Sequence, residues 1–308
     1  MIRSLFILFL FPGLGFQILC GLAFEWMDRK LLARFQRRVG PPWYQPLADL
    51  IKLFSKEDLL PESASGLFEM LLPLLSMSAV LTAGLYIPIA GFTSFSFEGD
   101  LIVIQFLMSV PTLAYYLAGI ASVGIYSIIG GGRSILQYLS YEVPLLITIS
   151  GPAVMAGSWS VAEISQTQAT MGPFVIFQPL GLILAIIGLI GKLKRDPLDI
   201  PSASSEVVGG SLTEFSGTKL GFWYLVMDIQ AVVGIFLLVN LYFGWSDFSL
   251  PLLGIGIFIF LCLLMVVILS GTSAIFARLR IDQLAGLGWK ILVPLSLLQL
   301  GFVILMGV

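Results

Sequence analysis

Apolar residues occur along this chain in long runs that short polar segments separate. Eight runs are candidates for helices that cross a membrane, and they cover residues 5–24, 68–90, 101–128, 143–162, 173–191, 220–244, 249–276 and 290–307. About 20 consecutive apolar residues are enough for an α-helix to cross a bilayer. Because the runs lack the period-2 alternation of a membrane β-barrel, the pattern predicts an all-α integral membrane protein with eight transmembrane helices.

A further helix is predicted in the polar segment that follows the first run. Leu47, Leu50, Ile51 and Phe54 have the i, i+3, i+4, i+7 spacing of one helix face within QPLADLIKLFSKED. Two interpretations stay open for this amphipathic helix. It either lies in the membrane interface or is a lateral element that packs on the protein's own helices or on a partner.

Composition agrees with a membrane protein, because only 11% of the 308 residues are charged, against about 25% in soluble domains. The chain has no histidine, and its two cysteines, Cys20 and Cys262, lie far apart in separate apolar runs. No GxGxxG, Walker A or nucleophile-elbow motif occurs. We therefore expect no metal, iron–sulfur cluster or other cofactor in this chain, and if the protein takes part in redox chemistry, partner subunits must hold the cofactors.

Positive charges are distributed asymmetrically along the chain. Fifteen of the 16 Lys and Arg residues lie in the segments that follow the first, third, fifth and seventh runs, and only Arg3 lies elsewhere. The positive-inside rule predicts that these segments are cytoplasmic and that both termini are outside. The opposite segments are slightly acidic and carry Glu98, Asp100, Glu163 and Asp247.

The chain is expected to form a single membrane domain over residues 1–308, with two long cytoplasmic loops at about residues 25–67 and 192–219. Long loops in compact proteins are usually functional. A stand-alone secondary transporter is one interpretation, but it predicts a substrate site at mid-membrane made by broken helices. The unusual polar residues lie in the cytoplasmic loops instead, which favours a docking partner.

Two acidic residues lie at or inside predicted membrane helices, where a charge costs about 2.5–3.5 kcal/mol on insertion scales. Glu142 opens the predicted fourth helix two residues before Pro144, so both a proton relay and a cap that complements the helix dipole stay open for it. Tyr138 lies one turn before Glu142. Asp228 lies about eight residues inside the sixth helix, where a cap is excluded and a relay or polar cluster is predicted.

The second long loop is rich in acidic residues. Ser211 and Glu214 have the spacing of a capping box, and Asp199 could cap a short helix over residues 201–207, whereas Glu206 has no such box. Apolar residues lie between the charges. The pattern predicts a folded loop that contacts another subunit or forms the mouth of a proton path.

Four sequence blocks occur in order across nearly the whole chain, and together they resemble the membrane subunit of complex I that docks the peripheral arm. The blocks are FEWMDRKLLARFQRRVGPPWYQPLADLIKLFSKED, SILQYLSYEVPL, RDPLDIPSASSEVVGGSLTEFSG and ARLRIDQLAGLGWKILVPLSL. Quinone-reducing members typically duplicate an Arg-Val-Gly-Pro unit, whereas RRVGPP here runs directly into WYQPLAD. The shorter form looks like the branch of membrane-bound nickel–iron hydrogenases and the related ferredoxin-linked sulfane reductase.

This resemblance implies the membrane anchor and coupling subunit of a ferredoxin-linked, hydrogen-evolving respiratory complex in a prokaryotic cell membrane. Implied partners are hydrogenase-like large and small subunits, a ferredoxin-type iron–sulfur subunit, antiporter-like membrane subunits and lipid, and not nucleic acid. Iron–sulfur clusters and, in a hydrogenase, a nickel–iron site would lie in those partners. The same role in a sulfane reductase or a NADH/quinone-type dehydrogenase is the alternative.

The resemblance also implies residue roles. Glu142, Glu206 and Glu214 would belong to an acidic proton path below the redox module, with Asp199 in the same loop. Positions of the docking loops match Arg29, Lys30, Arg38, Asp49, Lys52 and Arg195. One departure concerns a Glu that complex I members often place ten residues after a glycine. Counted from Gly217, that position is Met227 here, and Asp228 follows it.

Overall fold

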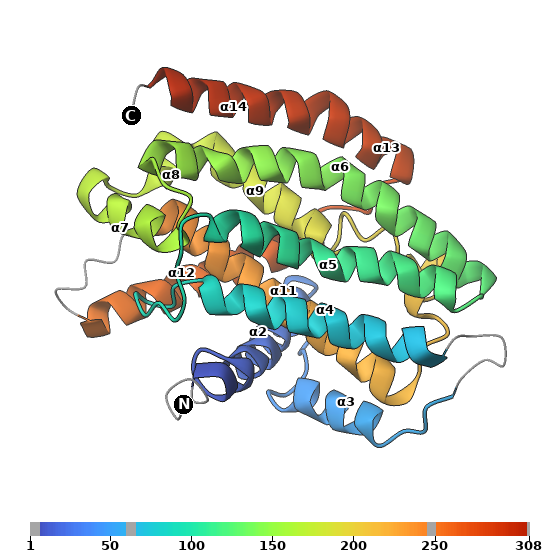
Figure 1. Ribbon diagram of the computed structural model, residues 1–308. Coiled ribbons are helices and arrows are strands. Elements are labelled where there is room, and N and C mark those ends of the chain that lie inside the picture. Colours follow the sequence, from blue (N-terminus) through green and yellow to red (C-terminus); the bar gives the residue numbers. More distant parts are fainter. Residues whose placement is uncertain (1–6, 60–65, 245–250, 307–308) are drawn as a thin grey trace.

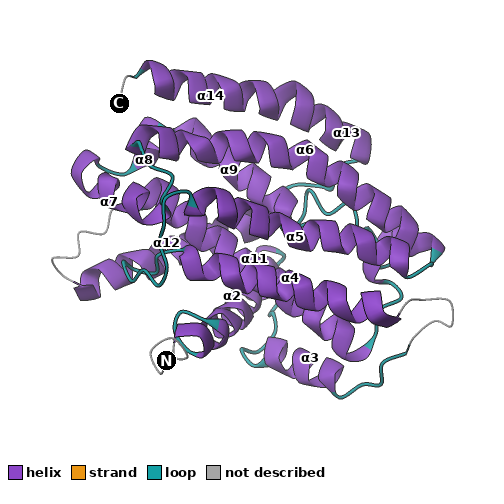
Figure 2. Cartoon of the chain, viewed as in Figure 1, coloured by secondary structure: helices purple, strands orange, loops and turns teal. Residues whose placement is uncertain are grey.

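A computed structural model describes residues 7–59, 66–244 and 251–306 of the chain, which are helical apart from connecting loops and one isolated β-bridge between Ile89 and Phe92 (Figures 1 and 2). The α-helices are α2 (Leu14–Phe35), α3 (Gln45–Phe54), α4 (Gly66–Tyr86), α5 (Asp100–Ala121), α6 (Ile125–Ala156), α7 (Val161–Met171), α8 (Phe174–Phe177), α9 (Pro179–Lys192), α10 (Ser204–Val207), α11 (Gly217–Phe243), α12 (Pro251–Ile275), α13 (Ile281–Leu287) and α14 (Val293–Leu305). A 3₁₀ turn, η1 (Gly210–Leu212), follows α10, and a π-helical turn, η2 (Gly288–Leu292), joins α13 to α14. The expected all-α membrane architecture is confirmed.

Among the described residues, seven helical segments are long and apolar enough to cross a membrane. They are Ile7–Phe35, Gly66–Tyr86, Asp100–Ala121, Ile125–Ala156, Gly217–Phe243, Leu253–Ile275 and Ile281–Leu305. The remaining expected span, residues 173–191, is divided between α8 and α9, because Pro179 begins a new helix after Gln178. With 14 residues, α9 is about 21 Å long at a rise of 1.5 Å per residue, shorter than the hydrocarbon core of about 30 Å.

Helix α11 lies at the centre of the bundle and packs against α2, α4, α7 and α12. Its residues from 229 to 242 are buried without exception. Helices α4, α5 and α6 follow one another side by side, and α14 packs on the far side of α6 (Figure 1). The core of the molecule is therefore made by the sixth predicted span, which the other helices surround.

Glycines set the distance between α6 and α9. A methyl group at Gly191 would come within 2.9 Å of the Tyr141 ring, and one at Gly188 within 2.8 Å of the Leu145 side chain. Small residues let membrane helices approach closely. Tyr141 and Gly191 each precede a charged residue, so this approach brings Glu142 and Lys192 to the same contact.

Two helix boundaries differ from the expected ones. Helix α2 continues through the polar segment to Phe35, so Arg29 and Lys30 lie on a helix and not in a loop. The helix continues because its charges are paired, since Arg29 Nε lies 2.5 Å from Glu25 Oε1 and a pair at i, i+4 supports a helix. Helix α6 likewise begins at Ile125, well before the expected residue 143.

The predicted amphipathic helix is confirmed as α3. It packs on α2 and α11, with Leu50 buried and the Phe54 ring 5.5 Å from that of Phe222. Leu47 and Ile51 remain about half exposed. The helix therefore combines both expected arrangements, because one side packs on the protein's own helices while the other leaves apolar side chains uncovered.

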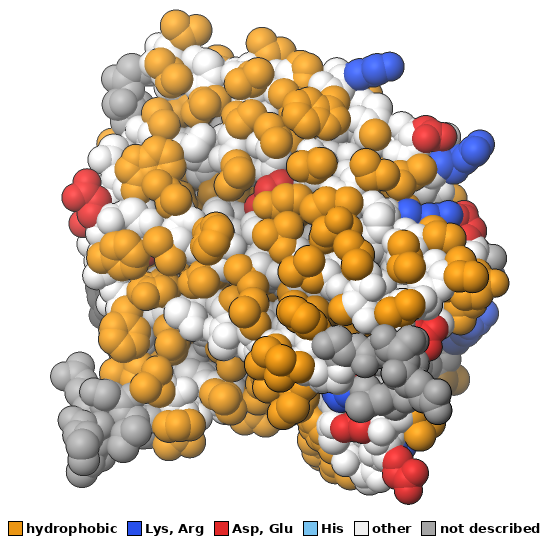
Figure 3. Space-filling view, turned by 45° about the vertical axis from the view of Figure 1, so that its right-hand side comes forward, with side chains coloured by type: hydrophobic (Ala, Val, Ile, Leu, Met, Phe, Trp, Pro, Cys, Tyr) orange, Lys and Arg blue, Asp and Glu red, His pale blue; other side chains and the backbone are white. Residues whose placement is uncertain are grey.

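The space-filling view shows one face covered by hydrophobic side chains, with the Lys and Arg side chains gathered at one edge of that face (Figure 3). This separation is what the charge pattern predicts for one polar end of a membrane bundle. Two residues used in the prediction of orientation, Arg3 and Asp247, lie outside the described residues.

Candidate functional site

Glu142 lies in the interior of α6 and not at its beginning. The helix starts at Ile125 and includes Pro144, so the interpretation of Glu142 as an N-terminal cap is wrong. The side chain is only 5% exposed. A carboxylate buried at such a depth needs a charged or hydrogen-bonding partner.

Lys192, the last residue of α9, is that partner. Its ammonium nitrogen Nζ lies 3.1 Å from Glu142 Oε1, and the lysine is 1% exposed. Ser109 Oγ on α5 donates to the same carboxylate oxygen at 2.6 Å, and Lys192 Nζ also donates to Gln105 Oε1 at 3.3 Å. Three helices thus converge on one buried ion pair.

Two residues shape the backbone next to Glu142. Pro144 has no backbone N–H, and Gly288 has no side chain. Pro144 cannot donate to the carbonyl of Ser140, four residues earlier. The η2 turn approaches at this point, where a methyl group at Gly288 would lie 2.3 Å from the Ser140 carbonyl oxygen. Single π-helical turns often occur at functional sites, and this one packs on α6 beside the buried pair.

A crevice of 270 Å³ between α5 and α6 reaches the buried pair. Tyr138, Gln105, Ser109 and Glu142 line it together with apolar residues such as Phe106, which is 69% exposed. Among the described residues, Glu142 Oε2 has no hydrogen-bond partner. The structure therefore brings Tyr138 and Glu142 together on the wall of one crevice, as expected, while Glu142 Oε2 is buried and unpaired among the described residues.

Asp228 belongs to a second group of charges between α2, α3 and α11. It lines a cavity of 240 Å³ with Glu25, Arg29, Asp49 and Lys52. Arg29 Nη1 donates to Asp49 Oδ2 at 2.8 Å. Partial burial raises the pKa of the Asp49 carboxyl, but the hydrogen bonds from Arg29 and Gln45 lower it by more. The pKa of Asp49 therefore lies below its ordinary value.

Arg195 joins the second loop to α2. It lies 2.8 Å from Asp28 and 3.7 Å from Glu25. Of the other expected docking residues, Lys30 donates to the carbonyl of Pro41 at 3.4 Å, and Arg38 is exposed. The basic residues therefore divide into those that fix helices to loops and those that remain free for contact.

The acidic loop is held by ion pairs and not by helix caps. Asp199 lies 3.1 Å from Arg278, and Glu206 pairs with Arg133 on α6. The capping interpretations are wrong, because α10 begins after Ala203 and α11 after Ser216, neither with a side-chain cap. Ser211 lies within the η1 turn, which ends five residues before α11 begins.

The remaining loop acids are close to helix ends. The Glu214 carboxylate packs against Gly124, where a methyl group would lie 2.5 Å from Glu214 Oε1. Burial raises the pKa of the Asp199 carboxyl above its ordinary value, although a hydrogen bond from Ser202 and the charge of Arg278 act in the opposite direction. The loop thus presents acids whose charge depends on their immediate contacts.

Three lysines that the charge pattern places in loops have specific partners that the sequence did not reveal. Besides Lys192, Lys219 donates to the buried Glu69 at 3.1 Å, and Lys194 lies over the Tyr115 ring, 3.4 Å from its centroid. Burial lowers the pKa of Lys194 to about 7. The one available signal was the place of each lysine directly beside an apolar run.

The described residues contain no group of three or more His, Cys, Asp and Glu side chains that could hold a metal ion. The charged groups are arranged in ion pairs instead.

Comparison with known proteins identifies the family of this chain. The sequence profile described as NADH dehydrogenase matches residues 8–304. In Dehalococcoides mccartyi strain 195, the NADH-quinone oxidoreductase subunit designated H is 38% identical over 297 residues, which cover 93% of this chain and 82% of that protein. The corresponding NADH-quinone oxidoreductase subunit of Helicobacter acinonychis is 35% identical, with 97% and 95% covered.

A solved structure is also similar over its whole length. A chain of the membrane-bound sulfane sulfur reductase, an archaeal respiratory membrane complex, has a TM-score of 0.88 at 28% identity and covers 98% of both chains. These relatives are subunits of oxidoreductase complexes, so the chain is a multi-pass protein of the prokaryotic plasma membrane and part of an oxidoreductase. The chain belongs to the NADH dehydrogenase family that includes these membrane subunits of NADH-quinone oxidoreductase.

Proposed function

We propose that this chain anchors a cytoplasmic redox module of a hydrogen-evolving, ferredoxin-linked complex and couples its chemistry to proton or sodium movement. The observation that carries the coupling role is the buried pair of Glu142 and Lys192 beside a crevice, in which Glu142 Oε2 has no hydrogen-bond partner among the described residues. Ionisable residues inside a membrane protein are functional candidates because they are costly to bury.

The pair can change its charge state without leaving the membrane. Transfer of one proton from Lys192 to Glu142 turns an ion pair into a neutral pair, and the 3.1 Å distance allows that transfer directly. The Glu142 side chain lines the crevice, so a proton that enters there can reach the carboxylate. Moving one elementary charge across the membrane costs about 2.3 kcal/mol per 100 mV, so a small shift in the stability of the two forms is enough to direct the proton.

The acidic loop provides the connection to the redox module. Glu206 pairs with Arg133, which lies on α6, the same helix that carries Glu142. A redox event that attracts or repels Glu206 would therefore act on α6 through Arg133. Asp199 and Glu214 extend this acidic surface, and Arg195 ties it to α2 near Asp228.

The single, unduplicated Arg-Val-Gly-Pro unit of the first loop favours the branch without quinone, in agreement with the cavity near Asp228. That cavity has 240 Å³ and a lining rich in charged side chains, whereas pockets for organic ligands usually have about 300–1,000 Å³ and mostly apolar walls. Electrons in this proposal come from ferredoxin, and iron–sulfur and nickel–iron partner subunits reduce protons to hydrogen.

A second candidate is the same role in a ferredoxin-dependent sulfane reductase. The overall similarity to a chain of the sulfane sulfur reductase favours it. Isolation of the native complex separates the two. Nickel with hydrogen evolution from reduced ferredoxin supports the hydrogenase, whereas iron–sulfur clusters without nickel and with reduction of sulfane sulfur support the reductase. A NADH/quinone-type activity would contradict both, and a chain that purifies without any redox partner would favour a stand-alone transporter instead.

The coupling role has its own test in two conservative variants. Glu142→Gln and Glu206→Gln should still assemble, keep electron transfer and lose coupled ion movement across proteoliposome membranes, although Glu142→Gln leaves Lys192 without its charged partner and should lower stability. The matched control is Glu163→Gln, an exposed glutamate outside these contacts, which should retain coupling. Full coupling in both test variants would overturn the role of the acidic path.

A further inference from the structure

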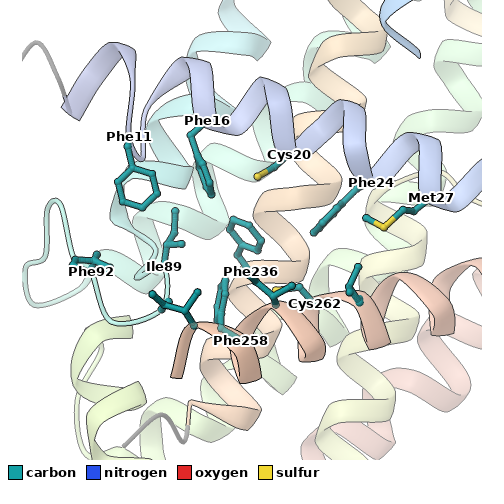
Figure 4. A pocket seen from close by; sticks show the side chains of 14 residues that line it. Phe11, Phe16, Cys20, Phe24, Met27, Ile89, Phe92, Phe236, Phe258 and Cys262 are labelled. Carbon is teal, nitrogen blue, oxygen red and sulfur yellow. The ribbon is translucent and has the colours of Figure 1, made fainter. Parts of the chain in front are cut away.

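A cavity of 420 Å³ lies between α2, α11 and α12, apart from the two groups of charges (Figure 4). Its lining residues are all apolar and include six phenylalanines. Both cysteines of the chain, Cys20 on α2 and Cys262 on α12, face it. The cavity plays no part in the proposed proton path.

The cavity is an elongated groove with a buried floor and an open rim. Phe236 and Cys262 on the floor are 6% and 3% exposed, whereas Phe92 and Ile259 at the rim are 57% and 52% exposed. Its lining along α2 extends from Phe16 to Met27, about 17 Å at a rise of 1.5 Å per residue, and Phe11 continues it just before that helix begins.

One end of the groove stops at the charged residues of α2. Met27 lines the groove, and the next residue, Asp28, pairs with Arg195 at 2.8 Å and accepts a hydrogen bond from Ser270 of α12 at 2.5 Å. The other end lies at Phe11 and Phe92. The groove therefore follows the membrane-crossing direction of α2 through apolar surroundings only.

The apolar lining and the size of the groove exclude two kinds of occupant, water and a partner helix. Water needs two to four polar partners to stay in a buried site, and the lining residues offer no polar side chain of that kind. A complete partner helix is too large to lie inside the groove, since a cylinder about 11 Å wide and 17 Å long has roughly 1,600 Å³, against 420 Å³ for the cavity. An empty groove would leave its walls without contacts on one side.

We propose that this groove binds one hydrocarbon chain of a membrane lipid. Such a chain is narrow, apolar and flexible, and it can enter through the exposed rim from the surrounding bilayer. Aromatic rings and the polarizable sulfurs of Cys20, Met27 and Cys262 form adaptable contacts along its length. The bound chain joins α2 to α12 at the end opposite the contact between Asp28 and Ser270.

The test uses the intact complex in nanodiscs of phosphatidylglycerol and phosphatidylcholine, with a diazirine in the middle of one acyl chain of the phosphatidylcholine. After irradiation, mass spectrometry locates the labelled residues. Labelling of the buried floor, at Phe236, Phe258 or Cys262, supports the proposal, because bulk lipid does not reach those residues. Labels confined to exposed positions, or a cross-link from the floor to a partner protein, would overturn it.

A variant that fills the groove provides a second test of the proposal. Cys20→Trp places a large side chain in the cavity and should reduce floor labelling to background, whereas the neighbouring Leu19→Trp should leave it unchanged because Leu19 is 69% exposed and does not line the groove. Floor labelling that persists in an assembled Cys20→Trp complex would contradict the assigned location.

Discussion

Removal of Lys192 tests the buried pair most directly. In Lys192→Met, the Glu142 carboxylate loses its charged partner and Gln105 loses a donor, while Ser109 still donates to Glu142. Loss of one member of a buried ion pair costs about 3–5 kcal/mol. Since both members are almost fully buried, solvent does not compensate, and we expect the free energy of unfolding to fall by that amount.

A double-mutant cycle separates the pair from other effects of the substitution. Glu142→Gln combined with Lys192→Met leaves no unpaired charge, so the double variant should be more stable than Lys192→Met alone by about 2–3 kcal/mol, within the usual range of coupling between contacting residues. Met resembles Lys in length, which limits any change in packing volume. The unfolding of the chain by denaturant in detergent micelles measures each corner of the cycle.

The same variants test function. Lys192→Met should abolish coupled ion movement even where the complex assembles, because the remaining Glu142 either stays unpaired or binds a proton permanently. Stability of the double variant equal to that of Lys192→Met would refute the reasoning, since it would mean that the two charges do not interact. Normal coupling in Lys192→Met would refute the proton exchange between them.

Three further predictions concern packing and pH. Gly288→Ala should weaken the contact of η2 with α6, because the new methyl group would lie 2.3 Å from the Ser140 carbonyl oxygen, and a lowered melting temperature of the complex would record it. Leu50→Ala should loosen α3, at a cost of about 2–5 kcal/mol for a buried leucine, and increase hydrogen exchange in that helix. The depressed pKa of Asp49 means that its contribution to stability is present above the ordinary pKa of about 3.9 and is lost as pH falls through the folded value. Spin-label distances between α2 and α3 should therefore increase in acid, and should not respond in Asp49→Asn; a constant distance in the native chain would disprove the role of the Arg29 contact.

The lengths of the apolar runs determined most of the fold before any tertiary contact was considered. Membrane helices must satisfy their own backbone hydrogen bonds and must span a fixed thickness, so a run such as residues 101–128 leaves few alternatives to α5. The sequence also predicted α3, because Leu50 and Phe54 recur at the spacing of one helix face. The apolar run at 173–191 was misleading, because length alone did not reveal the break at Pro179.

Tertiary structure decided which charges belong together. The sequence identified Glu142 but left both a cap and a relay open, and it counted Lys192 among the cytoplasmic charges that orient the chain. Only the close approach of α6 to α9 at Tyr141 and Gly191 brings these two residues, 50 positions apart, into one ion pair. The sequence shows which charges are costly to bury. The ion pair that offsets this cost depends on the distances between helices, and those distances are determined by packing.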